Sequence, residues 1–172
     1  MTNTVKKINM LDAVKLFFKN YFNFTGRASR SEFWWFTLAY FIVIFIISFI
    51  EGFLMALSGN YTGTPIVSNL LILAMFIGQL SLNARRLQDR GYSGWWQTVV
   101  YPPLILMYIF LFSFILNESG GAAFGMGLFG LIAMGFGITL IVFYCLPPKE
   151  DENKWGRNPL LPETSSTDQI PD

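Results

Sequence analysis

The chain has 172 residues, of which 53% are hydrophobic and only 13% are charged, and 18 of them are phenylalanine. A soluble domain of this length cannot bury so much apolar side chain, so the composition excludes an ordinary soluble fold and indicates a membrane protein. The chain contains no histidine, one cysteine and a net charge of +1. These numbers exclude an intramolecular disulfide, remove the commonest general base, and give no reason to expect a nucleic-acid partner.

An amphipathic segment comes before the main apolar part of the chain. Within residues 10–22, apolar side chains recur at helical spacing and charged side chains occupy the other positions. This pattern is typical of a short helix that lies in the membrane interface. The apolar members are Leu11, Val14, Phe17, Phe18, Tyr21 and Phe22, and the charged members are Asp12, Lys15 and Lys19.

Four apolar runs follow, each long enough for a helix to cross the hydrocarbon layer of a bilayer. Their bounds are about 33–55, 65–83, 95–116 and 122–146. The sequence therefore predicts an all-α, polytopic membrane protein with four transmembrane helices. We expect residues 1–161 to form one domain and residues 162–172, which are polar and contain proline, to form a disordered tail.

Several helix ends carry recognisable signals. Ser29 and Glu32 have the spacing of a capping box directly before the first run. Thr64 and Pro65 predict an N-cap followed by proline at the first position of the second helix. That helix continues beyond the apolar run as a polar extension, and Gly91 is expected to be its left-handed C-cap.

The third and fourth runs carry signals of a different kind. Pro102 and Pro103 predict either a kink or a late helix start in the third run. In the fourth run small residues recur four apart, beginning with Gly121 and Gly125, which lets helices approach closely in lipid. We expect this spacing to serve packing within the bundle; a self-dimerisation face is the alternative.

The basic residues define an orientation. All 12 Lys and Arg residues lie before the first run, between the second and third runs, or after the fourth. The two remaining loops contain no basic residue and carry only Glu51 and Glu118. With four spans, the three basic regions share one side, and the positive-inside rule predicts that this side, with both termini, is cytoplasmic. The tryptophans gather on the same side: Trp34, Trp35, Trp95, Trp96 and Trp155.

This cytoplasmic rim is the candidate functional site. Residues 25–36, 83–96 and 152–159 bring arginine and tryptophan to one face, where planar guanidinium groups suit phosphate and anionic lipid headgroups. Asp89 can pair with Arg85 or Arg86 on the helix surface, and at least two guanidinium groups should remain free. A topology signal with unspecific lipid contact is the alternative. The ligand-binding candidates are Arg27, Arg30, Glu32, Trp34, Trp35, Arg85, Arg86, Asp89, Arg90, Trp95 and Trp96.

Three of these stretches carry a family resemblance. The segments GRASRSEFWWF, RRLQDRGYSGWW and NKWGRNP resemble the signature of the bacterial inner-membrane family called domain of unknown function 805. The resemblance covers residues 20–160 and implies a small, multi-pass protein of the bacterial inner (plasma) membrane, with no established activity. Many relatives carry histidine where this chain has Gln88, so a role that needs an imidazole is not expected here.

The leading functional hypothesis is a non-enzymatic membrane protein whose rim binds anionic lipid headgroups or a protein partner, which includes a second copy of the chain. We expect no catalytic residue, metal or cofactor, because no motif for any of these is present. One alternative is a small oligomeric transporter or channel, suggested by Glu51, Asn69 and Gln79. Another is an enzyme acting on a lipid phosphate, with Asp89 or Glu32 as the base.

Overall fold

The structure is a computed structural model that describes residues 8–59 and 63–161, so the predicted disordered tail at 162–172 lies outside the described residues. Apart from loops, the described residues form helices and one short strand pair. Four stretches of the described residues are long and apolar enough to cross a membrane, which confirms the predicted all-α fold with four spans. The elements are α1 (Met10–Lys19), α2 (Arg30–Leu57), α3 (Ile66–Asp89), the 3₁₀ helix η1 (Gly94–Val100), α4 (Tyr101–Asn117), α5 (Gly120–Cys145), β1 (Glu152–Asn153) and β2 (Gly156–Arg157).

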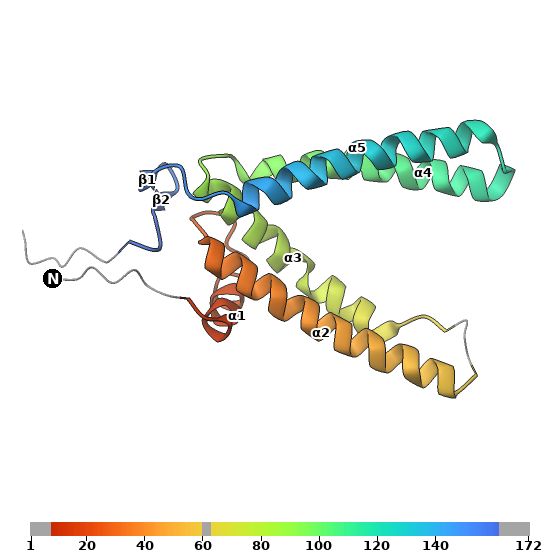
Figure 1. Cartoon of the computed structure of the whole chain (residues 1–172), viewed down its shortest axis with the longest axis horizontal. Coiled ribbons are helices and arrows are strands. Elements are labelled where there is room, and N and C mark those ends of the chain that lie inside the picture. The colour runs from red at the N-terminus through yellow and green to blue at the C-terminus, as the bar shows by residue number, and fades with distance from the viewer. Residues whose placement is uncertain (1–7, 60–62, 162–172) are drawn as a thin grey trace, which may run out of the picture.

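The long helices form two antiparallel hairpins, α2–α3 and α4–α5. Figure 1 shows the hairpins meeting at one end of the molecule, where α1 and the β1–β2 pair also lie, and diverging toward the other end. We call the shared end the basic end and define it as residues 8–36, 80–101 and 144–161. The hairpin portions beyond it are called the arms. The strands pair antiparallel, with Glu152 opposite Arg157 and Asn153 opposite Gly156.

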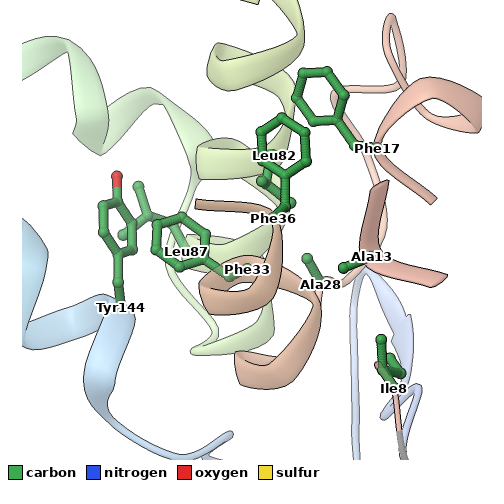
Figure 2. Packing of buried hydrophobic residues seen from close by; sticks show 9 residues of the cluster. All are labelled: Ile8, Ala13, Phe17, Ala28, Phe33, Phe36, Leu82, Leu87 and Tyr144. Atoms are coloured by element: carbon green, nitrogen blue, oxygen red, sulfur yellow. The ribbon is translucent and has the colours of Figure 1, made fainter. Parts of the chain in front are cut away.

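The buried core lies at the basic end (Figure 2). Phe17 of α1 stacks on Phe36 of α2, with ring centroids 3.7 Å apart and an interplanar angle of 10°. Phe33 of α2 packs against Tyr144 of α5 at 4.8 Å between ring centroids. These contacts hold α1 and both hairpins together. The buried apolar cluster comprises Ile8, Ala13, Phe17, Ala28, Phe33, Phe36, Leu82, Leu87 and Tyr144.

The signals at two helix ends are confirmed in part. Ser29 Oγ accepts a hydrogen bond from the Glu32 N–H at 3.1 Å, as a capping box requires. The Glu32 carboxylate also pairs with Arg85 of α3, a contact that the capping box alone does not predict. Gly91 adopts φ +83° after α3, and the N–H of Tyr92 reaches back to the carbonyl of Leu87 at 3.1 Å. This is the predicted left-handed C-cap.

The start of α3 differs from the prediction. Pro65, which was expected at the first helical position, is itself the N-cap, so Thr64 does not cap this helix. The cap comes from the other helix of the hairpin. Glu51 of α2 accepts the N–H groups of Val67 and Ser68 at 2.6 and 3.0 Å, which satisfies two of the helix's free donors with a negative charge.

The two remaining expectations concern the second hairpin. The late helix start is confirmed, because η1 precedes the prolines and α4 begins at Tyr101 with proline in its first turn. Gly125 packs within the hairpin, since a Cβ there would lie 2.5 Å from the ring of Phe110. No atom of the described residues lies within 4 Å of a Cβ built at Gly121. Close packing between α4 and α5 therefore depends on Gly125 and not on Gly121.

Candidate functional site at the basic end

A buried carboxylate joins two arginines at the centre of the basic end. Arg27 Nε donates to Asp89 Oδ1 at 2.8 Å, and Arg86 Nη1 donates to Asp89 Oδ2 at 2.5 Å. The exposed fraction of all three side chains is 0–1%. The predicted pairing of Asp89 with a neighbouring arginine on its helix is confirmed for Arg86. The bridge to Arg27, 62 residues earlier in the chain, could not be read from helical spacing.

Arg86 fastens α5 to α3. Its Nε and Nη2 donate to the carbonyl of Tyr144 at 3.0 and 2.9 Å, and Nη2 also donates to the carbonyl of Leu146. Its Nη1 reaches the carbonyl of Ala28 at 3.4 Å. The last carbonyls of a helix have no N–H donor within the helix, and they carry the negative end of the helix dipole. A buried guanidinium at this position is therefore electrostatically favourable.

Arg27 holds the strand pair in the same way. Its Nη1 donates to the carbonyls of Asp151 and Gly156 at 3.2 and 3.1 Å. Its Nη2 donates to the carbonyl of Glu150 at 2.9 Å and to that of Asp89 at 3.5 Å. A single side chain from the loop before α2 therefore fixes the segment that follows α5.

The sequence predicts that at least two of the rim guanidinium groups remain free, and these bonds show that Arg27 and Arg86 are not among them. A guanidinium has five N–H donors. Each of these two arginines makes five hydrogen bonds to described parts of the chain, so each is fully engaged without a ligand. In this structure the two arginines join the two hairpins to each other. They also tie the loop between α1 and α2 to the segment that follows α5.

Arg85 differs from its neighbour. Its Nη1 donates to Glu32 Oε1 at 2.9 Å, and the two side chains are 3% and 5% exposed. Its Nε and Nη2 are also buried but have no partner among the described residues. Arg85 lines a cavity of about 200 Å³ beside α1. The cavity is bounded by Ile8, Leu16, Asn20, Asn23, Thr25, Gly26, Arg27, Glu32, Arg85 and Pro159.

The other predicted residues lie nearer the protein surface than this network. Arg90 is half-buried and donates Nη1 to the carbonyl of Pro147, while its Nε is buried without a partner among the described residues. Arg30 is exposed at the first position of α2. The four predicted tryptophans at the span boundaries, Trp34, Trp35, Trp95 and Trp96, are exposed by 40%, 41%, 79% and 54%. The structure therefore separates the candidates into two groups. One is a buried ionic network, and the other is a set of more exposed residues that includes the four tryptophans.

Two glutamines at this end were missed as site residues. Gln88 Nε2 donates to the carbonyl of Phe24 at 2.9 Å, and Gln97 Nε2 donates to that of Leu80 at 3.1 Å. Both line a second cavity of about 640 Å³ between α3 and η1. The only sequence signal was the position of Gln88 in the RRLQD stretch, because an uncharged side chain gives no indication of its burial.

The residues behind the transport hypothesis lie apart from both cavities. Glu51 holds the start of α3, as described above. Asn69 is exposed on α3 and Gln79 is half-buried on the same helix. Neither Asn69 nor Gln79 lines either of the two cavities. A transport role for these three residues stays a prediction.

Comparison with known proteins identifies the family of the chain. Residues 21–157 match the family described as "Protein of unknown function (DUF805)". Inner membrane protein YhaI of Escherichia coli K12 is 38% identical over 104 residues, which cover 60% of this chain and 83% of YhaI. Inner membrane protein YhaH of the same strain is 30% identical over 108 residues, covering 62% of this chain and 88% of YhaH. No solved structure matches. The match to most of the chain, and to all three motif stretches in large part, shows that this four-span membrane protein belongs to the DUF805 family.

Proposed function

We propose that this chain is a non-enzymatic protein of the bacterial inner membrane whose basic end binds the phosphate of an anionic lipid headgroup, with Arg85 as the binding residue. One observation carries the proposal. Arg85 is the predicted rim arginine that lines a cavity while its Nε and Nη2 lack partners among the described residues. A buried N–H without an acceptor costs about 1–3 kcal/mol, so an acceptor from outside the chain would stabilise this arrangement.

The charges favour an anion with a single negative charge. The buried network contains three arginines, Arg27, Arg85 and Arg86, against two carboxylates, Glu32 and Asp89, which leaves one positive charge in excess. A phosphodiester headgroup carries one negative charge, and its paired oxygens fit a guanidinium fork. Asn20 and Asn23 supply amide groups on the wall of the same cavity.

The position of α1 supports access from the lipid side. Phe17 faces the protein core, whereas Leu11, Phe18 and Phe22 are exposed by 69%, 54% and 77%. Such a helix buries its remaining apolar face favourably in the membrane interface. We propose that α1 lies there, so that a lipid headgroup at the same depth reaches the cavity beside Leu16.

The orientation is part of the proposal. The basic residues of the described segments all belong to the basic end, and positively charged loops favour the cytoplasmic side. A reporter fused after Asp172 tests this. We expect a fluorescent-protein fusion to be bright and an alkaline-phosphatase fusion to be inactive. The reverse pair of results would place the basic end in the periplasm and remove the access argument.

The binding test is lipid retention by the full chain. The protein is reconstituted with an equal mixture of phosphatidylglycerol and phosphatidylcholine, then extracted and examined by native mass spectrometry. We expect wild type to retain phosphatidylglycerol preferentially. The double variant Glu32→Gln with Arg85→Gln should lose this preference, because it removes the fork and leaves no unpaired charge behind.

Two controls make the test specific to the cavity. Lys15→Gln removes an exposed positive charge from α1 and should retain phosphatidylglycerol, since unspecific attraction contributes little at one surface site. Arg85→Lys keeps the charge but lacks the fork and should bind clearly less than wild type. Equal retention by wild type and the double variant would refute the proposal.

A further inference from the structure

The larger cavity is a second, chemically different site. Its volume of about 640 Å³ falls in the range of small-molecule pockets. Leu80, Ala84 and Gln88 of α3 follow one another at intervals of four residues and form one wall. η1 and the first residue of α4 form the facing wall. None of the residues that line this cavity carries a formal charge at neutral pH, in contrast to the cavity beside Arg85.

Its apolar lining is largely aromatic. Phe24 comes from the loop before α2, Trp95 from η1, Tyr101 from the start of α4, and Trp155 from the turn of the strand pair. Trp95 is 79% exposed, which places it at the outer edge, whereas Trp155 is half-buried. Aromatic faces drawn from four separate segments offer apolar and ring-stacking contact to a ligand.

Two polar atoms in this lining lack partners. Gln88 and Gln97 are more than nine-tenths buried, and the Oε1 atoms of both have no hydrogen-bond partner among the described residues. Their Nε2 atoms are bonded to the carbonyls of Phe24 and Leu80. Those bonds fix the amide orientation, because a flipped amide would place two oxygens against each other. The free groups are therefore acceptors, and they require a donor.

The hydroxyl groups of the lining do not supply that donor. Thr98 Oγ1 donates to the carbonyl of Trp95 at 2.7 Å. Ser93 Oγ accepts the N–H of Trp95 at 3.4 Å, at the start of η1. Neither Gln88 Oε1 nor Gln97 Oε1 has a hydrogen-bond partner among the described residues, so both acceptors are left for a molecule from outside.

We infer that this cavity binds an uncharged, apolar molecule that carries a hydroxyl group. The ligand's hydroxyl donates to Gln97 Oε1 or Gln88 Oε1, and its apolar body packs between the aromatic side chains. An ionised ligand is disfavoured because no opposite charge lines the cavity. Two sources share this chemistry: a ring alcohol such as a phenol, and the free hydroxyl of a neutral lipid such as a diacylglycerol.

The test compares matched probes on the full chain in phosphatidylcholine nanodiscs. The ring probes are 6-(trifluoromethyl)-2-naphthol and its methyl ether, which has the same ring without the donor. Their dissociation constants are measured by fluorine NMR titration. We expect the naphthol to bind saturably and about tenfold more tightly than the ether, the ratio that one hydrogen bond provides. Equal affinities, or no saturable binding of either alcohol, would overturn the inference.

Variants assign the binding to this cavity. Gln97→Met and Gln88→Met each remove one acceptor at similar volume, and the variant that removes the acceptor used by the ligand should reduce the naphthol-to-ether ratio to about one. Gln79→Met, a glutamine of α3 outside the cavity, should leave the ratio unchanged. Thr98→Trp fills the cavity from its exposed side and should abolish binding of both probes, which keeps the test decisive if Gln97→Met fails to fold. An unchanged ratio in both folded variants, Gln97→Met and Gln88→Met, would contradict the assignment.

A second pair of probes identifies the source. 1,2-Dioctanoylglycerol is compared with its 3-O-methyl ether by competition against the fluorinated naphthol. Tighter competition by the free alcohol would assign the cavity to neutral lipids, and its absence alongside naphthol binding would assign it to ring alcohols. The double variant Glu32→Gln with Arg85→Gln should bind these probes as wild type does, because the two cavities have different walls on α3.

Discussion

The basic end and the arms distribute their side chains in opposite ways. The basic end encloses charged and amide groups, and Arg86 and Asp89 are among the largest fully buried side chains of the described residues. The arms expose large apolar groups, such as Phe45, Leu73 and Phe124, which are 69–73% accessible in the protein alone. The difference indicates two kinds of stabilisation: specific hydrogen bonds join the segments at one end, and lipid replaces a protein core around the other.

Of the substitutions that test this difference, Asp89→Asn at the basic end should have the largest effect on stability. The substitution keeps the shape of the side chain but removes the charge that faces Arg27 and Arg86, both fully buried. Leaving buried charges without their partner costs about 3–5 kcal/mol. We expect a large fall in the unfolding midpoint in detergent, followed by tryptophan fluorescence, and faster proteolysis after Tyr144. Glu118→Gln, at an exposed carboxylate of the arms, is the matched control and should change neither readout.

Packing at the basic end should also tolerate less change than packing in the arms. A Cβ at Gly94 would lie 2.6 Å from Ala84 Cβ and 3.0 Å from Ala84 Cα, so Gly94→Ala must displace η1 from the α3 backbone. Overpacking of this kind costs about 1–3 kcal/mol. Gly127→Ala in α5 meets no described atom within 4 Å and should be neutral or stabilising by up to about 1 kcal/mol. Equal midpoints for the two variants would contradict the comparison.

At Gly125, between the two helices of the second arm, a similar substitution should have an intermediate effect. A Cβ at Gly125 would lie 2.5 Å from the ring of Phe110, which is a side chain that can turn away. We expect Gly125→Ala to destabilise by about 1 kcal/mol, less than Gly94→Ala, because a ring yields more easily than a backbone. Thermal unfolding of both variants under the same detergent conditions measures the order. A larger loss for Gly125→Ala would mean that the arms depend on close packing as much as the basic end does.

The sequence predicted the arms better than the basic end, for a physical reason. Apolar length and the positions of proline are local properties, so the four spans and the late start of α4 could be read directly from the chain. The cap supplied by Glu51 and the bridge from Asp89 to Arg27 join segments that are distant in sequence. Residue type showed that arginine would gather at one end, but not which guanidinium groups the chain itself would satisfy.

The candidate arginines share one end of the molecule, and their role in ligand binding stays a prediction. Arg27, Arg85 and Arg86 all lie at the basic end, yet only Arg85 keeps unpartnered nitrogens on a cavity among these three. Most of the carbonyls that engage the other two lie in the last turn of α5 or after it, for example at Tyr144 and Glu150. Backbone acceptors have no sequence signature, so counting acidic side chains could not show which guanidinium groups the chain itself engages.

The smallest expected effect concerns the hydrogen bonds between Glu51 of α2 and the start of α3, at the end of the α2–α3 hairpin away from the basic end. Glu51→Gln removes the negative charge from the start of α3 and leaves one amide oxygen, which can accept from Val67 or Ser68 but lacks the second carboxylate oxygen. Losing a cap and a charge at a helix N-terminus destabilises the helix, and the exposed position of this contact keeps the effect small. We expect a small decrease in the unfolding midpoint and faster hydrogen exchange confined to the first turn of α3. Lipid retention at the basic end should not change, because that end is bonded independently. If exchange instead increased throughout α3 and at the basic end, the two regions would be one cooperative unit, and their separation into a bonded end and lipid-supported arms would be wrong.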